Sequence, residues 1–316
     1  MSLRKKDSPA SITVRKAQTS HKLPLLLRLK ENIGGIFQRL LGHHGATFGG
    51  VVVIIAFLCA IFAPFLSPFD PLEQNLASRL KPLGWTDPDG HLYILGTDQL
   101  GRDVLSRIVF GSRVSLIVGT ASVLLGGILG LILGLVSGYF GKWIDDLIMR
   151  IVDITLSFPF IILALCIIAI LGTSLFNLII VLAITGWVIY ARVIRASVLS
   201  VKEMDFVQAA RAIGASNFKI ILRHILPNVV APFFVISSFQ VARMIIIEAS
   251  LGFLGLGVPP PIPTWGNMLS DGREYLQEAW WIGTFPGIAI VLLVLGINLL
   301  GDGLRDAFDP KTYLKE

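Results

Sequence analysis

Two ionisable residues, Arg243 and Glu248, interrupt the long apolar run 228–257. A charged side chain inside such a run is costly unless it faces a polar cavity or a partner group. Five positions separate them, or about 140° around a helix, so we do not expect the two to pair directly. Two interpretations remain open: one or both residues line a polar path, or they pair with another helix at an interface.

A second charged group, Asp98, Arg102, Asp103 and Arg107, lies in the long polar segment between the first two apolar runs. We expect a helix from Asp98 to Arg113, which brings Asp103 and Arg107 one turn apart. An exposed ion pair contributes under ~1 kcal/mol, so stability alone explains these charges poorly. Three roles remain open: a solvated cap, a contact with an external solute-binding protein, and a lid over the path.

Motifs for hydrolytic or metal chemistry are missing from the sequence. Its one Gly-Lys pair, Gly141-Lys142, is followed by Trp143, where a phosphate-binding loop has Ser or Thr. The histidines show no ligand spacing beyond the adjacent pair His43-His44, and there is no Gly-x-Ser-x-Gly element. We therefore predict that the chain is not an enzyme, has no catalytic residue and binds neither a metal nor a cofactor itself.

Composition places these residues in a membrane protein. The 316 residues are 54% hydrophobic and 15% charged, with a mean hydropathy of +0.75. Soluble domains carry about 25% charged residues, so a soluble enzyme, a disordered chain and a disulfide scaffold are excluded. The net charge of +6 fits an anionic membrane surface better than nucleic acid. The two cysteines, Cys59 and Cys166, lie in apolar runs, where we expect buried, unreactive thiols.

Apolar stretches long enough to cross a bilayer recur six times. The expected fold class is therefore an all-α integral membrane protein with six transmembrane helices. Twenty Lys and Arg residues lie on the side of the bundle that includes both termini, against six on the other side. By the positive-inside rule both termini are cytosolic in a multi-pass protein of the cytoplasmic membrane. The six expected spans are 46–66, 113–138, 151–171, 175–197, 228–257 and 280–303.

These spans divide the chain into four parts. Residues 1–45 form a cytosolic tail, in which Leu23–Leu41 has the periodicity of an amphipathic helix lying in the membrane interface. The other parts are the first span with its external loop, 46–112; a five-helix core, 113–303, with a cytosolic loop at 200–227; and a cytosolic tail, 304–316.

A glycine series runs along the second span. Its members are spaced four apart, so they share one helix face, where small residues let backbones approach closely. A packing seam within the chain is the favoured interpretation, with a seam against a partner subunit as the alternative. The series is Gly126, Gly130, Gly134 and Gly138.

The cytosolic loop is predicted to hold two short helices. The first runs from Lys202 to Ile213, and Gly214 occupies the position where glycine commonly ends a helix. Ser216 or Asn217 caps the second helix, and Pro227 breaks or kinks the entry to the fifth span. Ala209, Ala210 and Gly214 leave a bare surface on the loop. We interpret that surface as a docking site for a cytosolic protein, with a solvated connector as the alternative; tethering at both ends excludes DNA binding.

This loop carries a recognisable motif. Gln208-Ala209-Ala210-x3-Gly214, followed by Leu226-Pro227, resembles the EAA loop of permease subunits in binding-protein-dependent ABC importers, whose pattern is E-A-A-x3-G-x9-I-x-L-P. Gln208 replaces the usual Glu, and His224 replaces the Ile. The resemblance implies that this loop is the coupling helix that fits a groove on the ATPase subunit, and that restoring Glu at position 208 is tolerated.

Further motifs resemble the "C"-type permeases of the dipeptide, oligopeptide and nickel branch, over about Gly45 to Pro310. The resemblance implies a type I ABC importer-like permease fold. It also implies a homologous second permease subunit, two ABC ATPase subunits that hold ATP and Mg, and an extracytosolic solute-binding protein. The motifs are Leu95-Gly96-Thr97-Asp98-Gln99-Leu100-Gly101-Arg102-Asp103-Val104-Leu105-Ser106-Arg107, Ala249-Ser250-Leu251-Gly252-Phe253-Leu254-Gly255-Leu256-Gly257, Pro263-Thr264-Trp265-Gly266 and Asn298-Leu299-Leu300-Gly301-Asp302-Gly303-Leu304-Arg305-Asp306.

The expected solute is a di- or oligopeptide. Nickel chelates, glutathione and oligosaccharides remain alternatives within the same branch. In a different class, an ion-coupled secondary transporter usually needs acidic residues near the membrane midplane, and only Glu248 meets that requirement here. Such a transporter also leaves the docking loop without a purpose.

Overall fold

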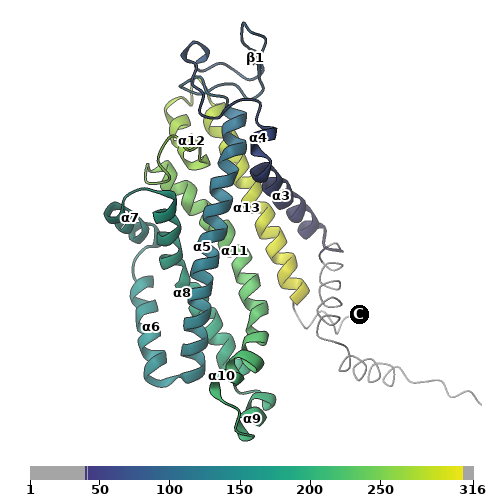
Figure 1. Cartoon of the computed structure of the whole chain (residues 1–316), viewed down its shortest axis with the longest axis vertical. Helices are drawn as coiled ribbons and strands as arrows, with labels where there is room; N and C mark the ends of the chain where they lie inside the picture. Colours follow the sequence, from purple (N-terminus) through teal and green to yellow (C-terminus); the bar gives the residue numbers. More distant parts are fainter. Residues whose placement is uncertain (1–39, 41, 309–316) are drawn as a thin grey trace, which may run out of the picture.

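The computed structural model describes residues 40 and 42–308, so most of the predicted amphipathic helix lies outside the described residues. Long helices form an elongated bundle with a small hairpin at one end and two short helices at the other (Figure 1). The elements in chain order are α3 (His44–Ile61), α4 (Ala63–Leu66), η1 (Leu76–Ser78), β1 (Trp85–Thr86), β2 (Leu92–Tyr93), α5 (Val104–Phe140), α6 (Lys142–Leu156), α7 (Phe160–Leu171), α8 (Leu175–Val201), α9 (Asp205–Ala212), α10 (Asn217–Ile220), η2 (Ile221–Ile225), α11 (Leu226–Phe253), α12 (Trp265–Glu274) and α13 (Trp281–Phe308).

The centre of the bundle is the packing of α5 along α8. The predicted glycine seam lies at this contact, which confirms the packing within the chain. A Cβ atom added at Gly130 would come 2.5 Å from the carbonyl oxygen of Trp187, and one at Gly138 would come 2.8 Å from Cβ of Val198. The two backbones therefore approach as closely as they do only because these positions carry no side chain.

Three further helices complete the bundle. Helix α3 packs against α13, and α11 packs between α13 and α5. Near the hairpin end, buried side chains of α5, α11, α12 and α13 share one apolar cluster that includes Trp265, Met268 and Trp281. The indole N–H groups of the two tryptophans donate to the carbonyl oxygens of Ile108 and Thr97, at 2.9 and 3.1 Å. These bonds fix α12 to the beginning of α5 and α13 to the segment that leads into α5.

The expected spans differ from the observed helices at several ends. Helix α5 begins at Val104 rather than at 113, because Asp103 caps its first turn, so the part boundary at 112/113 falls inside a helix. Helix α13 continues to Phe308, so the boundary at 303/304 also falls inside a helix. In the first span, α3 ends at Ile61 and a separate short helix, α4, follows it.

The third expected span is not straight. Residues 142–171 form α6 and α7, which meet at an angle of 89°. Pro159 stands at the N-terminus of α7, and proline both lacks an N–H and disfavours a helical residue before it. In the part of the chain that the structure describes, five helices are long and apolar enough to span a membrane, or six if the bent pair is one span.

The expected burial of both thiols is wrong for this chain. Cys59 is half-buried, and Cys166 is exposed on the outside of α7. Apolar runs of a membrane protein point many of their side chains away from the bundle, so a position within such a run does not imply burial against protein.

Candidate functional site

At the hairpin end, a buried charge cluster centres on Asp98. One carboxylate oxygen accepts a hydrogen bond from Nε of Arg102 at 2.7 Å and another from Nη1 of Arg107. The second oxygen accepts from the backbone N–H groups of Leu100 and Arg102, at 2.8 and 3.0 Å. The Asp98 side chain is 1% exposed, so this carboxylate is fully desolvated and fully paired.

Helix α12 contributes a fourth charge to this cluster. Nη2 of Arg102 and Nη2 of Arg107 both lie 3.6 Å from Oδ2 of Asp271, whose side chain is 32% exposed. The cluster therefore ties the segment before α5 to α12. Sequence reasoning missed Asp271, since a single acidic residue 164 positions from Arg107 gives no local signal of an ion pair.

The predicted pairing of Asp103 with Arg107 is wrong. Residues 98–103 form turns rather than a helix, and Asp103 is the N-cap of α5. Its Oδ2 accepts from the backbone N–H and the hydroxyl of Ser106, at 2.7 and 2.6 Å. Burial raises the pKa of Asp103, while the bonds from Ser106 oppose that shift. The four predicted external residues are all buried instead of exposed, and three of them form the cluster.

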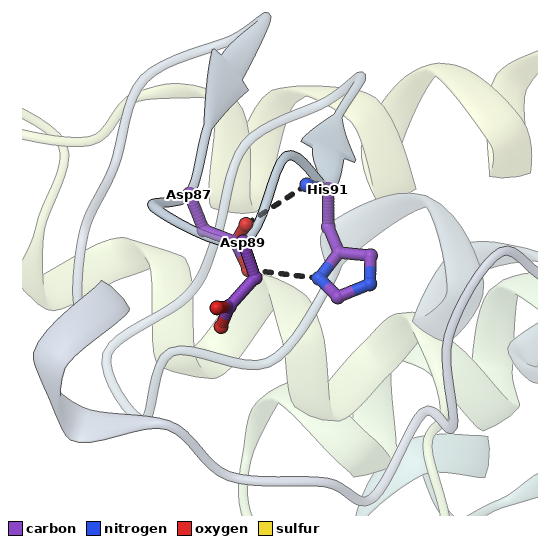
Figure 2. A group of neighbouring side chains, drawn as sticks. All are labelled: Asp87, Asp89 and His91. Carbon is purple, nitrogen blue, oxygen red and sulfur yellow. Dashed lines mark hydrogen bonds and ion pairs between the residues drawn. The ribbon is translucent and has the colours of Figure 1, made fainter.

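A different set of ligand-type side chains, Asp87, Asp89 and His91, lies on the hairpin β1–β2 (Figure 2). Oδ1 of Asp87 accepts the backbone N–H of His91 at 2.8 Å, and Oδ2 lies 3.1 Å from Nδ1 of the imidazole. The first of these bonds lowers the pKa of Asp87. These contacts close the hairpin turn, and the absence of a metal stays a prediction.

At the opposite end, α9, Gly214 and α10 form the predicted loop of two short helices. Gly214 has φ +79° and open space around it, as expected for a glycine that ends a helix. The first helix starts at Asp205, three residues later than expected. Ala209 is exposed, whereas Ala210 is buried in the apolar cluster below the loop, so only part of the expected bare surface is available.

Pro227 does not break the chain between the loop and the fifth span. The π-helical turn η2 joins α10 to α11, and the N–H of Leu226 donates to the carbonyl of Ile221, five residues back. Residues 217–253 therefore form one continuous helical unit. The wider turn accommodates a proline that cannot donate to the preceding turn.

Gln208 folds back on the loop that carries it. Its Nε2 donates to the carbonyl oxygen of Lys202 at 3.0 Å and lies 3.5 Å from Oε2 of Glu203. A carboxylate at position 208 has no hydrogen to donate and would face a carbonyl and a like charge. These contacts oppose the expectation that Gln208→Glu is tolerated.

Large apolar side chains are exposed on this loop. Ile213, directly after α9, is 85% exposed, and Phe218, in α10 at the start of the continuous unit 217–253, is 73% exposed. Further exposed apolar side chains on the same loop are Met204, Phe206 and Leu222. Exposed apolar groups gathered at one end of a helix bundle indicate a protein contact surface.

Three contacts hold this loop to α5, and sequence reasoning missed all three. The hydroxyl of Tyr139 donates to Oδ1 of Asn217 at 2.8 Å, and the guanidinium of Arg211 lies 5.9 Å from the Tyr139 ring centre. The ammonium of Lys202 donates to the carbonyl oxygen of Gly138 at 3.0 Å. The loop therefore rests on the end of α5 as well as continuing into α11.

Arg243 and Glu248 have different surroundings, and no ion pair joins them within the described residues. Glu248 is fully buried, and its Oε2 accepts from the hydroxyl of Ser115 on α5 at 3.1 Å. Arg243 lines a cavity of about 520 Å³ between α7, α11 and α13, with its guanidinium 4.9 Å from the Phe160 ring centre.

Comparison with solved structures defines the class of this fold. A chain from inward-facing structures of the MetNI methionine ABC transporter matches with a TM-score of 0.53 at 23% identity, over 65% of this chain and 98% of that one. The fold is that of a type I ABC importer permease: an all-α integral membrane protein.

Sequence comparison adds the family. Residues 130–313 match the binding-protein-dependent transport system inner membrane components, and residues 33–82 match the N-terminal TM domain of oligopeptide transport permease C. The chain belongs to the family of binding-protein-dependent transport system inner membrane components, and it is an ABC importer permease subunit.

Two relatives illustrate this membership. The chain is 47% identical to the dipeptide transport system permease protein DppC of Escherichia coli K12, over 85% of this chain and 90% of that protein. It is 41% identical to the glutathione transport system permease protein GsiD of Pectobacterium atrosepticum, over 87% of this chain and 90% of that protein.

Proposed function

We propose that this permease imports dipeptides and other short peptides, together with a homologous second permease subunit, two ABC ATPase subunits and an extracytosolic solute-binding protein. The relative named as a dipeptide permease, at 47% identity, supports the substrate class. ATP and Mg bind to the ATPase subunits in this proposal, and this chain hydrolyses no ATP and binds no cofactor.

The observation that carries the proposal is the apolar surface on α9 and α10. Ile213 and Phe218 are largely exposed there, next to Gly214, where an added Cβ atom would meet no atom within 4 Å. A shallow apolar surface of this kind suits the groove of another protein. The residues assigned to ATPase coupling are Gln208, Ala209, Ala210, Gly214, Leu226 and Pro227.

The proposed orientation puts this loop and both termini in the cytosol of a bacterium or archaeon. The excess of Lys and Arg at the loop end supports it, because such an excess marks the cytosolic side. The hairpin end of the bundle is then on the external side. Asp98, Arg102, Asp103 and Arg107 lie at that end. The segment 67–103, which joins α4 to α5 and contains the hairpin, reaches the region where a solute-binding protein approaches.

Coupling follows from the continuity of α10, η2 and α11. Closure of the ATPase subunits on ATP pushes the loop, and the continuous unit 217–253 passes that movement to the bundle. The bundle then switches between inward-facing and outward-facing states. ATP bound to the ATPase subunits shifts the equilibrium between these two states. Arg243 on α11 lines the solute path in this proposal, whereas Glu248 holds α11 to α5 through Ser115.

Glutathione is the second candidate, because the permease named for glutathione transport is 41% identical to this chain. An uptake assay separates the peptide candidate from the glutathione candidate. It measures radiolabelled Ala-Ala and glutathione in cells without this chain and in the same cells with the gene restored. Loss of uptake on ATP depletion, with the ion gradient intact, supports the ABC mechanism. Uptake that follows the ion gradient alone contradicts it.

Gly214→Trp tests the docking surface, with Gly141→Trp as its matched control. Both glycines have positive φ and open surroundings, and both lie at the same end of the bundle. We expect Gly214→Trp to retain normal membrane abundance but to lose co-purification of the ATPase and stimulated ATP hydrolysis. We expect Gly141→Trp to keep both. Wild-type coupling in Gly214→Trp would make this loop a plain connector.

A further inference from the structure

A cavity of about 420 Å³ lies at the hairpin end, beside the buried charge cluster. Its size falls within the range of about 300–1,000 Å³ that is typical of small-molecule sites. The α11–α12 connection forms one wall, and α12, the segment before α5, the first turn of α5 and the α7–α8 connection form the rest. The lining includes Gln99, Arg102, Arg107, Ser270 and Asp271.

The lining combines both signs of charge. Arg102 and Arg107 present two guanidinium groups, and Asp271 presents one carboxylate. Asp98 pairs with both arginines but does not line the cavity. Asp98 and Asp271 together balance the two guanidinium groups, so the cluster carries no net charge while the wall presents both signs.

Two of the lining residues each carry a buried polar atom without a hydrogen-bond partner in the described chain: Nε of Arg107 and Oε1 of Gln99. The Arg107 residue is 4% exposed, so its Nε–H is a desolvated donor. An unpaired buried donor or acceptor is costly, by about 1–3 kcal/mol, and such atoms are usually satisfied by a ligand or water. One is a donor on a cation and the other is an amide acceptor, which are the groups that a carboxylate and an N–H would meet.

We propose that this cavity is an external subsite for the free termini of a short zwitterionic peptide. The peptide carboxylate accepts from Arg107 Nε–H, its ammonium group lies toward Asp271, and Gln99 Oε1 accepts an N–H of the peptide. This inference rests on the proposed peptide function and adds to it a recognition site in the permease itself.

Cysteine protection tests the subsite in the intact permease–ATPase complex, held in nanodiscs without the solute-binding protein. The background variant of this chain carries Cys59→Ser and Cys166→Ser. Ser270→Cys then places one thiol in the cavity wall, and Asp89→Cys places a matched thiol on the exposed hairpin. A negatively charged methanethiosulfonate labels each thiol, and mass spectrometry of this chain gives the rate.

Three ligands test which charged group of the peptide the cavity recognises. We expect Ala-Ala to slow labelling at Ser270→Cys and to leave Asp89→Cys unchanged. Ala-Ala-amide lacks the carboxylate. It should need a concentration about tenfold higher for the same protection, because the charge-assisted bond to Arg107 is lost. N-acetyl-Ala-Ala, which lacks the ammonium group, shows a smaller loss because only Asp271 is affected. Equal protection by all three, or none by any, overturns the subsite.

Two variants of the lining make the test specific. In the Ser270→Cys background, Gln99→Leu removes an unpaired acceptor without touching an ion pair, and Arg107→Lys keeps the charge but removes Nε. Both should weaken protection by Ala-Ala while labelling without peptide continues. In a separate measurement with the solute-binding protein added, protection by that protein together with none by Ala-Ala also overturns the proposal. Uptake in cells is measured separately, so peptide uptake without protection rejects the subsite and leaves the proposed function standing.

Discussion

Asp98 accepts from two arginine side chains and two backbone N–H groups, all from the segment between Leu100 and the first turn of α5. Each oxygen of its carboxylate therefore accepts two hydrogen bonds, and its side chain is 1% exposed. Removal of one partner from such a group leaves the other charges buried and unpaired. That cost exceeds the value of an exposed pair several-fold.

Asp98→Asn should therefore destabilise the permease strongly, by roughly 3 kcal/mol, because an amide N–H₂ would face two guanidinium donors. Asp87→Asn is the matched control: its amide oxygen still accepts the N–H of His91, and the partner imidazole is 61% exposed. Thermal unfolding of the purified complex, followed by fluorescence-detected size exclusion, measures both. Equal midpoints for the two variants would contradict a structural role for the cluster.

Substitutions of Arg243 and of Glu248 should affect different properties, namely uptake and assembly. Arg243→Ala should keep normal assembly but reduce uptake several-fold, since the side chain lines a cavity and forms no ion pair with Glu248. Glu248→Ala should reduce assembly itself, because it removes the acceptor of Ser115 from the core. Glu248→Gln keeps the volume and an acceptor and should restore assembly. Membrane abundance and uptake, measured together, distinguish the roles, and wild-type uptake by Arg243→Ala would remove it from the path.

Among the elements, the contact of α5 with α8 depends on the absence of side chains. A Cβ atom at Gly130 meets the backbone of α8, whereas one at Gly50 on α3 lies 3.8 Å from Cδ1 of Leu300, an ordinary contact. Helix propensity favours alanine over glycine at both positions. Packing must therefore decide the difference between them.

Gly130→Ala should lower the stability of the bundle by about 1–3 kcal/mol, the usual cost of overpacking. Gly50→Ala should leave it unchanged or slightly raised. The melting temperature of each variant in the same detergent gives the answer. A Gly130→Ala protein as stable as Gly50→Ala would mean that α5 and α8 separate without cost.

Two features that depend on residues close together in the sequence were predicted correctly. The four-residue glycine spacing predicted the α5 seam, and Gly214 marked the end of a short helix. By contrast, the bend at Pro159 was hidden within an apolar run, since hydropathy counts residues and ignores direction. Asp271 and Tyr139 were also missed, because each acquires its role from a partner far away in the sequence. Their contacts arise from the packing of whole helices and leave no periodic signal.

At the scale of the whole molecule, α5 connects the two ends of the bundle. It is one helix of 37 residues, about 55 Å long at 1.5 Å per residue. Arg107 lies in its first turn, within the charge cluster and the wall of the hairpin-end cavity. Tyr139 lies in its last turn and holds the loop through Asn217. A continuous element in contact with both sites is the physical basis for coupling between them.

This arrangement predicts that ATP changes the hairpin-end cavity through Tyr139. Labelling of Ser270→Cys should change severalfold when the ATPase subunits are trapped with MgATP and vanadate, since the proposed switch reaches both ends of α5. Tyr139→Phe removes one hydroxyl and its bond to Asn217 while keeping the ring under Arg211. It should reduce the change in labelling and raise the ATP consumed per peptide, with ATPase co-purification retained. Tyr93→Phe, which removes a hydroxyl at the other end, should behave as wild type. An undiminished response in Tyr139→Phe would show that α11 alone transmits the movement.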